Sequence, residues 1–437
     1  MQNKFQTIFL GVFLAFFVFA VMIFAGILPI GKSKSAQSAI VGNVTIWGTF
    51  PSSALSPIVR DMNSKNKNLR VSYQYHDERN YQQDLIEAFA LGKGPDLFLV
   101  SDDMLVRNTP FLSQLPYVSY PEKAFRDTFI DGADILLGST GLLGMPVVVD
   151  PLVLYYNKDL LANEGIAKVP ESWDQLFDLS SKLTKKQSDG TINQSMIALG
   201  GFENINHAKD ILALLLLQSG DSITERVPGK DTVIAVMKNA FGLPVSPLES
   251  VLSFYTSFGT ATSDVYSWNR GLPNSKELFT AGKLAFYVGR ASELFSIESI
   301  NPNLSFDVTK VFQTKGTQTT RTYGKIYSLG INNKSPNAVA SAGVMSLFVV
   351  PDTSKALALA LSLPPVQRTL LASVPTDPYL YSFYKSAIVA RGWLDPDTTA
   401  TDTIFRDMIQ NILSNKFSVR DAGTKAHGQL EALLPKQ

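Results

Sequence analysis

The chain contains no cysteine among its 437 residues and only three histidines. Without cysteine there are no disulfides, thiolate metal sites, cysteine nucleophiles or lipid-modified cysteine anchors. The histidines, His76, His207 and His427, lie far apart in the sequence, and none has another at metal-ligand spacing, which argues against a zinc enzyme. We therefore predict no metal site and no cofactor, although scattered acids leave a calcium site with oxygen ligands open.

The chain also lacks a strong excess of either charge. Its first forty residues contain three lysines and no acids, and the remainder carries 36 basic and 38 acidic side chains. This near balance gives no electrostatic reason to expect a nucleic-acid partner. The length is sufficient to fill more than one hydrophobic core, so two lobes are expected.

One long apolar run is present near the N-terminus. Residues 8–30, IFLGVFLAFFVFAVMIFAGILPI, carry no charge and would span roughly 34 Å as a helix. The apolar part of a cleaved signal peptide is usually only about 7 to 15 residues long. The sequence therefore predicts an N-terminal flank at 1–7, a retained transmembrane signal anchor at 8–30 and a linker at 31–42. Cleavage near the small residues of SKSAQSA remains an alternative.

Beyond the linker, apolar strands alternate with helical segments. VTIW, LRVSY and DLFLV, which begin at Val44, Leu69 and Asp96, read as strands, and 52–64 and 80–91 read as helices between them. This alternation is typical of the α/β class and predicts a mainly parallel sheet covered on both faces.

Later helices carry clearer end signals. SPLESVLSFYTSFG has Ser246 three residues before Glu249, and SWDQLFDLSSKL has Ser172 three residues before Gln175. ILALLLLQSG, residues 211–220, is apolar on all sides until its glycine, which predicts a buried helix.

A set of six segments occurs in a fixed order along the chain. They are ALGKGPDLFLVSDDM (90–104), GMPVVVDPLVLYYNKDLL (144–161), VPESWDQL (169–176), YSWNRG with FTAGKLAFYVG (266–289), YGKIYSLGINNKSPNA (323–338), and WLDPD with SVRDAG (393–423). With this ordered set the chain resembles the extracellular solute-binding proteins of ABC importers. The resemblance is to the maltose-binding-like class, which mostly carries oligosaccharides.

The resemblance implies a two-lobed periplasmic-binding-protein-like fold of the α/β class, with hinged lobes around a central cleft. The expected crossings between the lobes lie near 149–151, 323–328 and 350–353. The predicted N-terminal lobe is 43–149 plus 328–351, and the predicted C-terminal lobe is 150–327 plus 352–437.

The same resemblance implies a function. The protein would capture a small solute, expected to be a carbohydrate, by hinge closure and deliver it to ABC permease subunits. It would be a monomeric, single-pass protein of the cell membrane, with its globular part on the extracytoplasmic side and no enzymatic activity. An anchored glycoside hydrolase using two carboxylates and a signalling receptor are the alternatives. Peptides, polyamines and acidic sugars remain open as solutes.

Sugar clefts use flat aromatic surfaces together with a few directed polar groups. Trp47 ends the first strand and is either a cleft residue or part of a lobe core. Trp173 is assigned to the core. The remaining aromatic and amide candidates for ligand contact are Tyr266, Trp268, Asn269 and Trp393.

Two acids and one tyrosine complete the candidates that follow the family pattern. Asp150 lies at the first predicted crossing, where its carboxylate can accept hydrogen bonds from sugar hydroxyls. Asp103 follows the buried strand DLFLV, and a helix N-cap is the competing role for it. Tyr155 and Tyr156 point to opposite faces of a strand, so only one can face the cleft, and Tyr155 is the candidate.

The sequence departs from the family at one functional position. After FTAGKLAFYV the maltose-binding pattern continues with a Gly-Pro-Trp stacking platform, whereas this chain continues with GRASEL. No tryptophan is available there, and Arg290, Ser292 and Glu293 occupy the region. The guanidinium of Arg290 either binds a carboxylate or phosphate of the ligand or forms an ion pair with Glu293.

Overall fold

The computed structural model describes residues 40–238, 242–317 and 319–435. The predicted anchor at 8–30, its flank at 1–7 and most of the linker lie outside the described residues. Within the described part of the chain no single helix is long and apolar enough to cross a membrane. The helix pair Ala338–Phe348 and Pro351–Leu361 passes that test only in combination, and it is bent by 73°.

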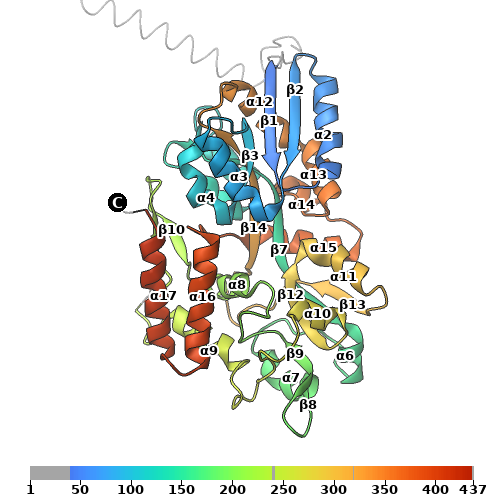
Figure 1. The fold of residues 1–437 in the computed structure, drawn as a ribbon. Helices are drawn as coiled ribbons and strands as arrows, with labels where there is room; N and C mark the ends of the chain where they lie inside the picture. Colours follow the sequence, from blue (N-terminus) through green and yellow to red (C-terminus); the bar gives the residue numbers. More distant parts are fainter. Residues whose placement is uncertain (1–39, 239–241, 318, 436–437) are drawn as a thin grey trace, which may run out of the picture. The chain divides into compact units, whose positions relative to one another are not determined.

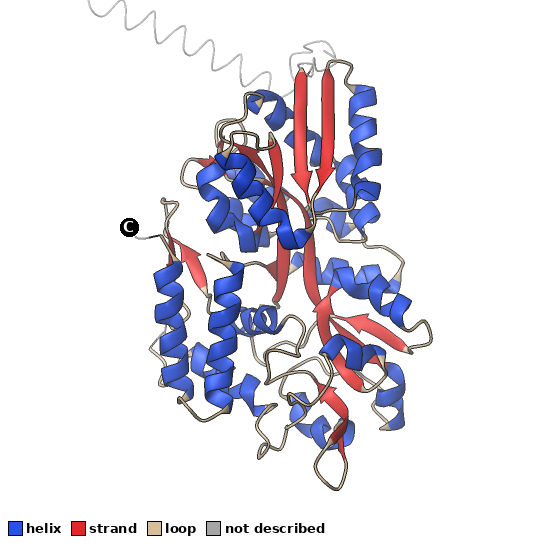
Figure 2. Ribbon diagram, in the orientation of Figure 1, coloured by secondary structure: helices blue, strands red, loops and turns tan. Residues whose placement is uncertain are grey.

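The protein folds into two α/β lobes, which occupy the upper and lower halves of Figures 1 and 2. The first lobe contains the N-terminal strands and helices, with two later helices returning to it. Its elements are β1 (Gly42–Gly48), α2 (Ser52–Lys65), β2 (Leu69–Tyr75), α3 (Glu78–Ala90), β3 (Leu97–Ser101), α4 (Asp102–Asn108), η1 (Thr109–Phe111), β4 (Leu112–Ser113), β5 (Leu115–Pro116), α5 (Glu122–Thr128), η2 (Asp131–Leu136), β6 (Gly141–Leu142), α12 (Ala338–Phe348) and α13 (Pro351–Leu361).

The second lobe is built from the middle and the C-terminal end of the chain. Its elements are α6 (Lys158–Asn163), α7 (Gln175–Leu183), β8 (Lys185–Lys186), β9 (Ile192–Ile197), α8 (Ala208–Gln218), β10 (Thr224–Arg226), β11 (Val233–Ala235), α9 (Pro247–Ser257), α10 (Ser275–Thr280), β12 (Leu284–Arg290), η3 (Ala291–Glu293), α11 (Leu294–Ile300), β13 (Phe306–Thr309), α14 (Arg368–Ala372), α15 (Pro378–Ile388), β15 (Ala390–Arg391), α16 (Thr398–Leu413) and α17 (Val419–Leu433).

Two long strands, β7 (Met145–Asn157) and β14 (Thr322–Asn332), run from one lobe into the other. They lie side by side in a sheet ordered β2-β1-β3-β14-β7-β12-β9-β8. The sheet is mixed, which corrects the prediction of a mainly parallel one. β1, β2 and β3 are parallel, as the alternation of strands and helices indicates, but β14 is antiparallel to both β3 and β7. The reason is that β7 and β14 cross between the lobes in opposite directions.

A third connection between the lobes follows α13. The sequence placed it near 350–353, yet α13, which begins at Pro351, packs against α2 of the first lobe. Further along the chain, Pro365 forms a β-bridge with Val148, and the Val149 N–H donates to the carbonyl of Pro364 at 3.2 Å. This packing argues against a crossing at 350–353 and favours one close to the bridge.

Several local predictions are confirmed. β1, β2, β3 and α2 lie where the apolar pattern placed them. Ser246 caps α9 by accepting a hydrogen bond from the Glu249 N–H at 3.2 Å. All eleven residues of α8 are buried, which confirms the prediction of a buried helix made from the apolar run that begins at residue 211. Trp173 is buried and donates from Nε1 to Gln218 Oε1 at 2.7 Å, as expected of a core residue.

The helix after Ser172 begins later than the sequence predicts. Its N-cap residue is Asp174 rather than Ser172. The Gln175 side chain accepts hydrogen bonds from the N–H groups of Glu171 and Ser172, while the Trp173 N–H donates to the carbonyl of Gln313. Because these three N–H groups have partners that are not backbone carbonyls of α7, the first turn of α7 lies further toward the C-terminus than predicted.

Candidate ligand-binding site

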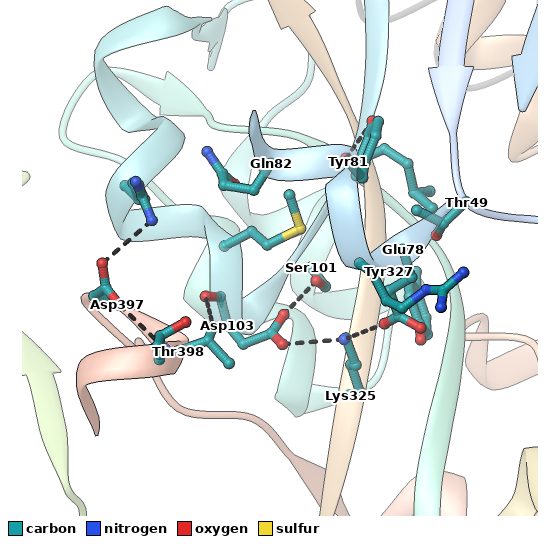
Figure 3. A pocket seen from close by; sticks show the side chains of 15 residues that line it. Thr49, Glu78, Tyr81, Gln82, Ser101, Asp103, Lys325, Tyr327, Asp397 and Thr398 are labelled. Atoms are coloured by element: carbon teal, nitrogen blue, oxygen red, sulfur yellow. Dashed lines mark hydrogen bonds and ion pairs between the residues drawn. The ribbon is translucent and has the colours of Figure 1, made fainter. Parts of the chain in front are cut away.

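Two cavities lie between the lobes, close to the carboxyl ends of β1 and β3. The first-lobe cavity, shown in Figure 3, has a volume of about 240 Å³ and extends from Thr49 to the N-terminus of α16. The second-lobe cavity has a volume of about 460 Å³ and extends from α8 to α16. Asp103 and Thr398 line both cavities. The carboxyl end of a parallel sheet is the usual ligand position in open α/β folds, which makes this cleft the candidate site.

Asp103 is held at this position by the turn from β3 into α4. It is the second residue of α4, and the N-cap residue is Ser101, so Asp103 is not the helix cap. Its carboxylate accepts a hydrogen bond from the Ser101 hydroxyl and lies 3.0 Å from the ammonium of Lys325. Burial opposes ionisation, but Lys325 and Ser101 together hold the pKa of Asp103 below its usual value. Asp103 therefore presents a negative charge to both cavities.

Lys325 is the central cation of the first-lobe cavity (Figure 3). Only 7% of its side chain is exposed, and Nζ lies 3.1 Å from Glu78 Oε1 in addition to its contact with Asp103. Burial alone would lower the pKa of Lys325, but the charge of Asp103 outweighs this effect and raises the pKa well above its usual value. The ammonium joins three elements, since Lys325 lies on β14, Asp103 on α4 and Glu78 at the start of α3.

The neighbouring acid, Asp102, has a structural role. Its carboxylate accepts hydrogen bonds from the Ile326 N–H at 3.1 Å and from the Tyr323 hydroxyl at 3.0 Å. Burial and the negative charge of Asp103 raise the pKa of Asp102 to about 8. A Cβ atom at Gly392 would lie 2.8 Å from Asp102 Oδ2, so a residue without a side chain is required where this segment approaches α4.

The floor of the second-lobe cavity is an ion pair between Arg290 and Asp210. The Arg290 guanidinium Nη2 lies 2.6 Å from Asp210 Oδ2, and the neighbouring Nε lies 3.3 Å from the same oxygen. Burial alone would raise the pKa of Asp210, but Arg290 and His207 hold it far below its usual range. The guanidinium of Arg290 therefore pairs with Asp210 rather than with the carboxylate of Glu293.

Glu293 belongs to the layer behind this ion pair. It contacts His207 Nε2 at 3.0 Å and Lys276 Nζ at 3.1 Å, and it accepts a hydrogen bond from the Tyr287 hydroxyl at 2.9 Å. Burial opposes its ionisation, but His207 first, and then Lys276, lower the pKa of Glu293 to about 2. The layer fixes the position of His207, which lines the second-lobe cavity.

We expect Glu293→Gln to reduce the dependence of stability on acid pH. In the unfolded chain Glu293 titrates near 4.5. Its stabilising effect is therefore complete above that pH and is lost as the pH falls toward about 2, which amounts to roughly 3 kcal/mol. Urea unfolding at pH 7 and pH 3 should show a smaller difference in free energy of unfolding for the variant. Equal differences for the variant and the native protein would contradict the assignment.

The two lobes also touch directly at the cleft. The Thr398 hydroxyl, at the start of α16, donates to the backbone carbonyl of Asp103 at 3.0 Å. Arg107 on α4 pairs with Asp397 at 3.2 Å. These contacts between α4 and α16 lie where the walls of the two cavities meet.

The carboxylate of Asp150 makes its hydrogen bonds within the protein. It is 2% exposed, and its two carboxylate oxygens accept from the Ser292 N–H at 3.0 Å and the Ser292 hydroxyl at 2.6 Å. Burial raises the pKa of Asp150 from its usual value. The side chain thus ties β7 to the start of η3, which directly follows Arg290.

The structure brings together three of the predicted site residues, Asp103, Arg290 and Trp393. Trp393 is 3% exposed and lines the second-lobe cavity, with Lys209 Nζ 6.0 Å from the centre of its ring. The other six candidates line neither cavity. They are Trp47, Asp150, Tyr155, Tyr266, Trp268 and Asn269.

These other residues have partners of their own. Trp47 packs against His76 with ring centres 4.3 Å apart and the rings tilted by 35°. Tyr155 and Trp268 are completely buried; Tyr155 donates to the carbonyl of Arg290 at 2.8 Å, and Trp268 donates to Asn204 Oδ1 at 3.0 Å. In the same loop as Trp268, the Asn269 amide donates to the Tyr266 hydroxyl at 2.9 Å.

The sequence did not single out five residues that shape the two cavities. One signal was available, since the fully buried helix α8 begins with the charged pair Lys-Asp, and buried charges require partners. The five residues are Glu78, Lys209, Asp210, Lys325 and Asp395. Within the described ranges no group of three or more His, Cys, Asp or Glu side chains could hold a metal ion.

Comparison with solved structures defines the class of fold. The protein shares its fold with the cyclo/maltodextrin-binding protein solved with maltotetraose, with a TM-score of 0.70, 17% identity and 91% and 98% of the two chains covered. It is equally similar to the cyclic α-maltosyl-1,6-maltose binding protein of Arthrobacter globiformis, with a TM-score of 0.71, 16% identity and 90% and 99% covered. The GacH receptor of Streptomyces glaucescens, solved with acarbose, gives a TM-score of 0.66, 18% identity and 90% and 98% covered.

A protein-family model shows which family the chain belongs to. Residues 58–379 match the model of the bacterial extracellular solute-binding protein family. The match spans most of the chain and both lobes, and the protein belongs to this family.

Proposed function

We propose that the protein is the solute-binding component of an ABC importer and that its solute is a carbohydrate. The observation that carries this proposal is the position of the two cavities, which lie between the lobes and share Asp103 and Thr398, one from each lobe. A solute that contacts both residues favours the closed arrangement through its differential affinity. The structural neighbours solved with maltotetraose and acarbose support a carbohydrate as the solute.

The ligand contacts we propose are Asp103 as hydrogen-bond acceptor, Lys325 and Arg290 as donors, and Trp393 as apolar surface. Acceptors and donors alternate along the cleft, because each cation lies beside a carboxylate. Such alternation suits the hydroxyl groups of a sugar, which both donate and accept hydrogen bonds.

The hinge we propose consists of β7, β14 and the segment 363–367. In this arrangement β7 is the first crossing, β14 the second and 363–367 the third. The first lobe then includes α13, and its last segment ends at the bridge of Pro365 instead of at residue 351. Three crossings confine the relative motion of the lobes to bending about these strands.

We further propose that residues 8–30 anchor the protein in the cell membrane, with the lobes as a monomer on the extracytoplasmic side. Tethering keeps the lobes near the permease at high effective concentration and takes the place of a lipid-modified cysteine, which this chain lacks.

The solute class is tested by thermal unfolding of the purified full chain with neutral oligosaccharides, acidic sugars, peptides and polyamines. We expect neutral oligosaccharides to raise the midpoint, by an amount that grows with the logarithm of ligand concentration over Kd. A well-folded protein whose midpoint responds to none of the four classes would overturn the proposal. Release of reducing ends from a bound oligosaccharide would instead identify a hydrolase.

A further inference from the structure

The described part of the chain begins at one end of the first lobe. β1, β2 and β3 are parallel, so their amino ends lie at one edge of the sheet, and those of β1 and β2 are at the top of Figure 1. The carboxyl end of β14 lies at the same edge, because β14 is antiparallel to β3. Four short segments meet there, and we name their surface the tether face. They are residues 40–43, 65–69, 91–96 and 332–339.

Hydrogen bonds fix these segments to one another. The carboxylate of Asp96 accepts from the Thr45 N–H of β1 at 2.8 Å and from the Ser335 hydroxyl at 2.6 Å. The Gly42 N–H donates to the carbonyl of Asn68 at 3.1 Å. The tether face is therefore one surface whose parts have fixed relative positions.

The tether face is basic. Its segments contain four lysines and a single acid, Asp96, which is buried. Lys65 pairs with Asp61 of α2 at 2.7 Å. The flanking elements add one exposed cation, Arg70, and one exposed acid, Glu87, so cations exceed acids by five to three when Asp61 is included. Three exposed lysines have no described carboxylate within 4.0 Å of their ammonium groups. They are Lys67, Lys93 and Lys334.

Exposed apolar side chains lie among these lysines. Val41, Leu91 and Val339 are 64%, 71% and 90% exposed, and each belongs to one of the segments of the tether face. A surface that lies on an anionic membrane combines these two features, because its apolar side chains enter the interface while its ammonium groups are attracted to the lipid phosphates. The tether face thus matches the chemistry of an anionic lipid surface.

The length of the chain before β1 places the tether face within reach of the bilayer. Eleven residues, 31–41, separate the proposed anchor at 8–30 from β1, and fully extended they would span at most about 40 Å. They end within the tether face itself. The solute cleft lies at the opposite, carboxyl ends of β1 and β3, so lipid contact at the tether face leaves the cleft open to solute.

We propose that the tether face docks on the anionic lipid surface of the membrane that holds the anchor. The inference rests on the proposed anchor and goes beyond it, since a tether limits the distance of the lobes from the bilayer but not their orientation. Each lysine close to an anionic surface favours docking by about fivefold, and salt weakens this attraction.

The test uses the full chain in lipid vesicles, with a fluorescent label on one introduced cysteine, because the native chain has none. Energy transfer to acceptors on the lipid headgroups reports how close the label lies to the surface. For Val339→Cys, on the tether face, we expect stronger transfer in vesicles that contain phosphatidylglycerol than in vesicles of phosphatidylcholine alone. For Lys182→Cys, exposed on α7 of the second lobe, we expect no such increase.

Two triple variants, each labelled at residue 339, test the role of charge. The first should lower the ratio of docked to undocked protein by about 100-fold and reduce transfer to its value in phosphatidylcholine. It carries Lys67→Gln, Lys93→Gln and Lys334→Gln. The matched control removes three exposed lysines of the second lobe and should behave as the native protein does. It carries Lys182→Gln, Lys283→Gln and Lys416→Gln. Equal transfer in both kinds of vesicle, or an equal response of the two triple variants, would overturn the inference.

Flotation of the full chain with vesicles of phosphatidylcholine tests the anchor separately. A chain that does not float with them contradicts the anchor but still reports on docking. In that case flotation with phosphatidylglycerol vesicles that depends on the three lysines would support docking, and its absence would overturn docking as well.

Discussion

Replacing Lys209 with methionine is expected to lower the free energy of unfolding by about 3–5 kcal/mol. Lys209 lies at the start of the buried helix α8, and its ammonium is 2.9 Å from the carboxylate of Asp395. It also donates to the carbonyl of Thr398 and the hydroxyl of Thr401 at 3.1 and 3.0 Å. Methionine fills similar space, but it leaves the completely buried Asp395 without its cation. Urea unfolding followed by tryptophan fluorescence measures the loss.

Two further variants separate the lost charge pair from lost packing. The double variant Lys209→Met with Asp395→Asn removes the uncompensated charge and should recover much of the stability. Lys65→Met removes an ammonium from an exposed pair with Asp61 and should change the free energy of unfolding by less than about 1 kcal/mol. A double variant no more stable than Lys209→Met alone would indicate that packing, not the buried charge, accounts for the loss.

Replacing Asp103 with asparagine is expected to weaken solute binding by about 10- to 100-fold. This prediction rests on the proposed function. A hydrogen bond to a charged acceptor contributes about 1.5–3 kcal/mol, and asparagine retains the shape of the side chain but not its charge. Asp103 lines both cavities of the cleft, so a solute in either one loses the contact. Calorimetric titration with the sugar that gives the largest thermal shift measures the change in Kd.

A matched control guards against an indirect effect. Asp61 is an exposed acid on α2, and Asp61→Asn should leave Kd unchanged. Because Asp103→Asn also removes a partner of Lys325, its unfolding midpoint should be compared with that of the native protein. Unchanged affinity in a folded Asp103→Asn variant would exclude Asp103 as a solute contact.

The sequence predicted the parts of the fold that depend on local patterns. Strands β1, β2 and β3 and the capped helix α9 follow from apolar periodicity and from end signals within a few residues. Asp103 was a candidate because it matches the family pattern just after a buried strand, and the carboxyl ends of such strands lie at the cleft in this class of fold. The direction of β14 could not be predicted in this way, because it depends on a strand that crosses between the lobes.

The partners of the buried charges could not be predicted from local sequence patterns either. Lys325 lies in the apolar strand segment YGKIYSL, and nothing near it in the sequence shows that Asp103 and Glu78 will surround its ammonium. Likewise, the segment YSWN matches a part of the family pattern that reaches the cleft, yet Trp268 is buried against Asn204. Tertiary contacts decide which aromatic residues face a cleft and which fill the core.

The position of β14 also has a consequence for how the chain folds. β14 begins at Thr322, but it pairs with β3, which ends at Ser101, and it lies between β3 and β7 in the sheet. At a synthesis rate of about 5–20 residues per second, roughly ten seconds or more pass between the two strands. During that interval β3 has an unpaired edge, so the first lobe cannot complete its sheet and folding is governed by non-local pairing. The nascent chain therefore presents an apolar strand edge, a natural binding site for chaperones, until most of the second lobe has been made.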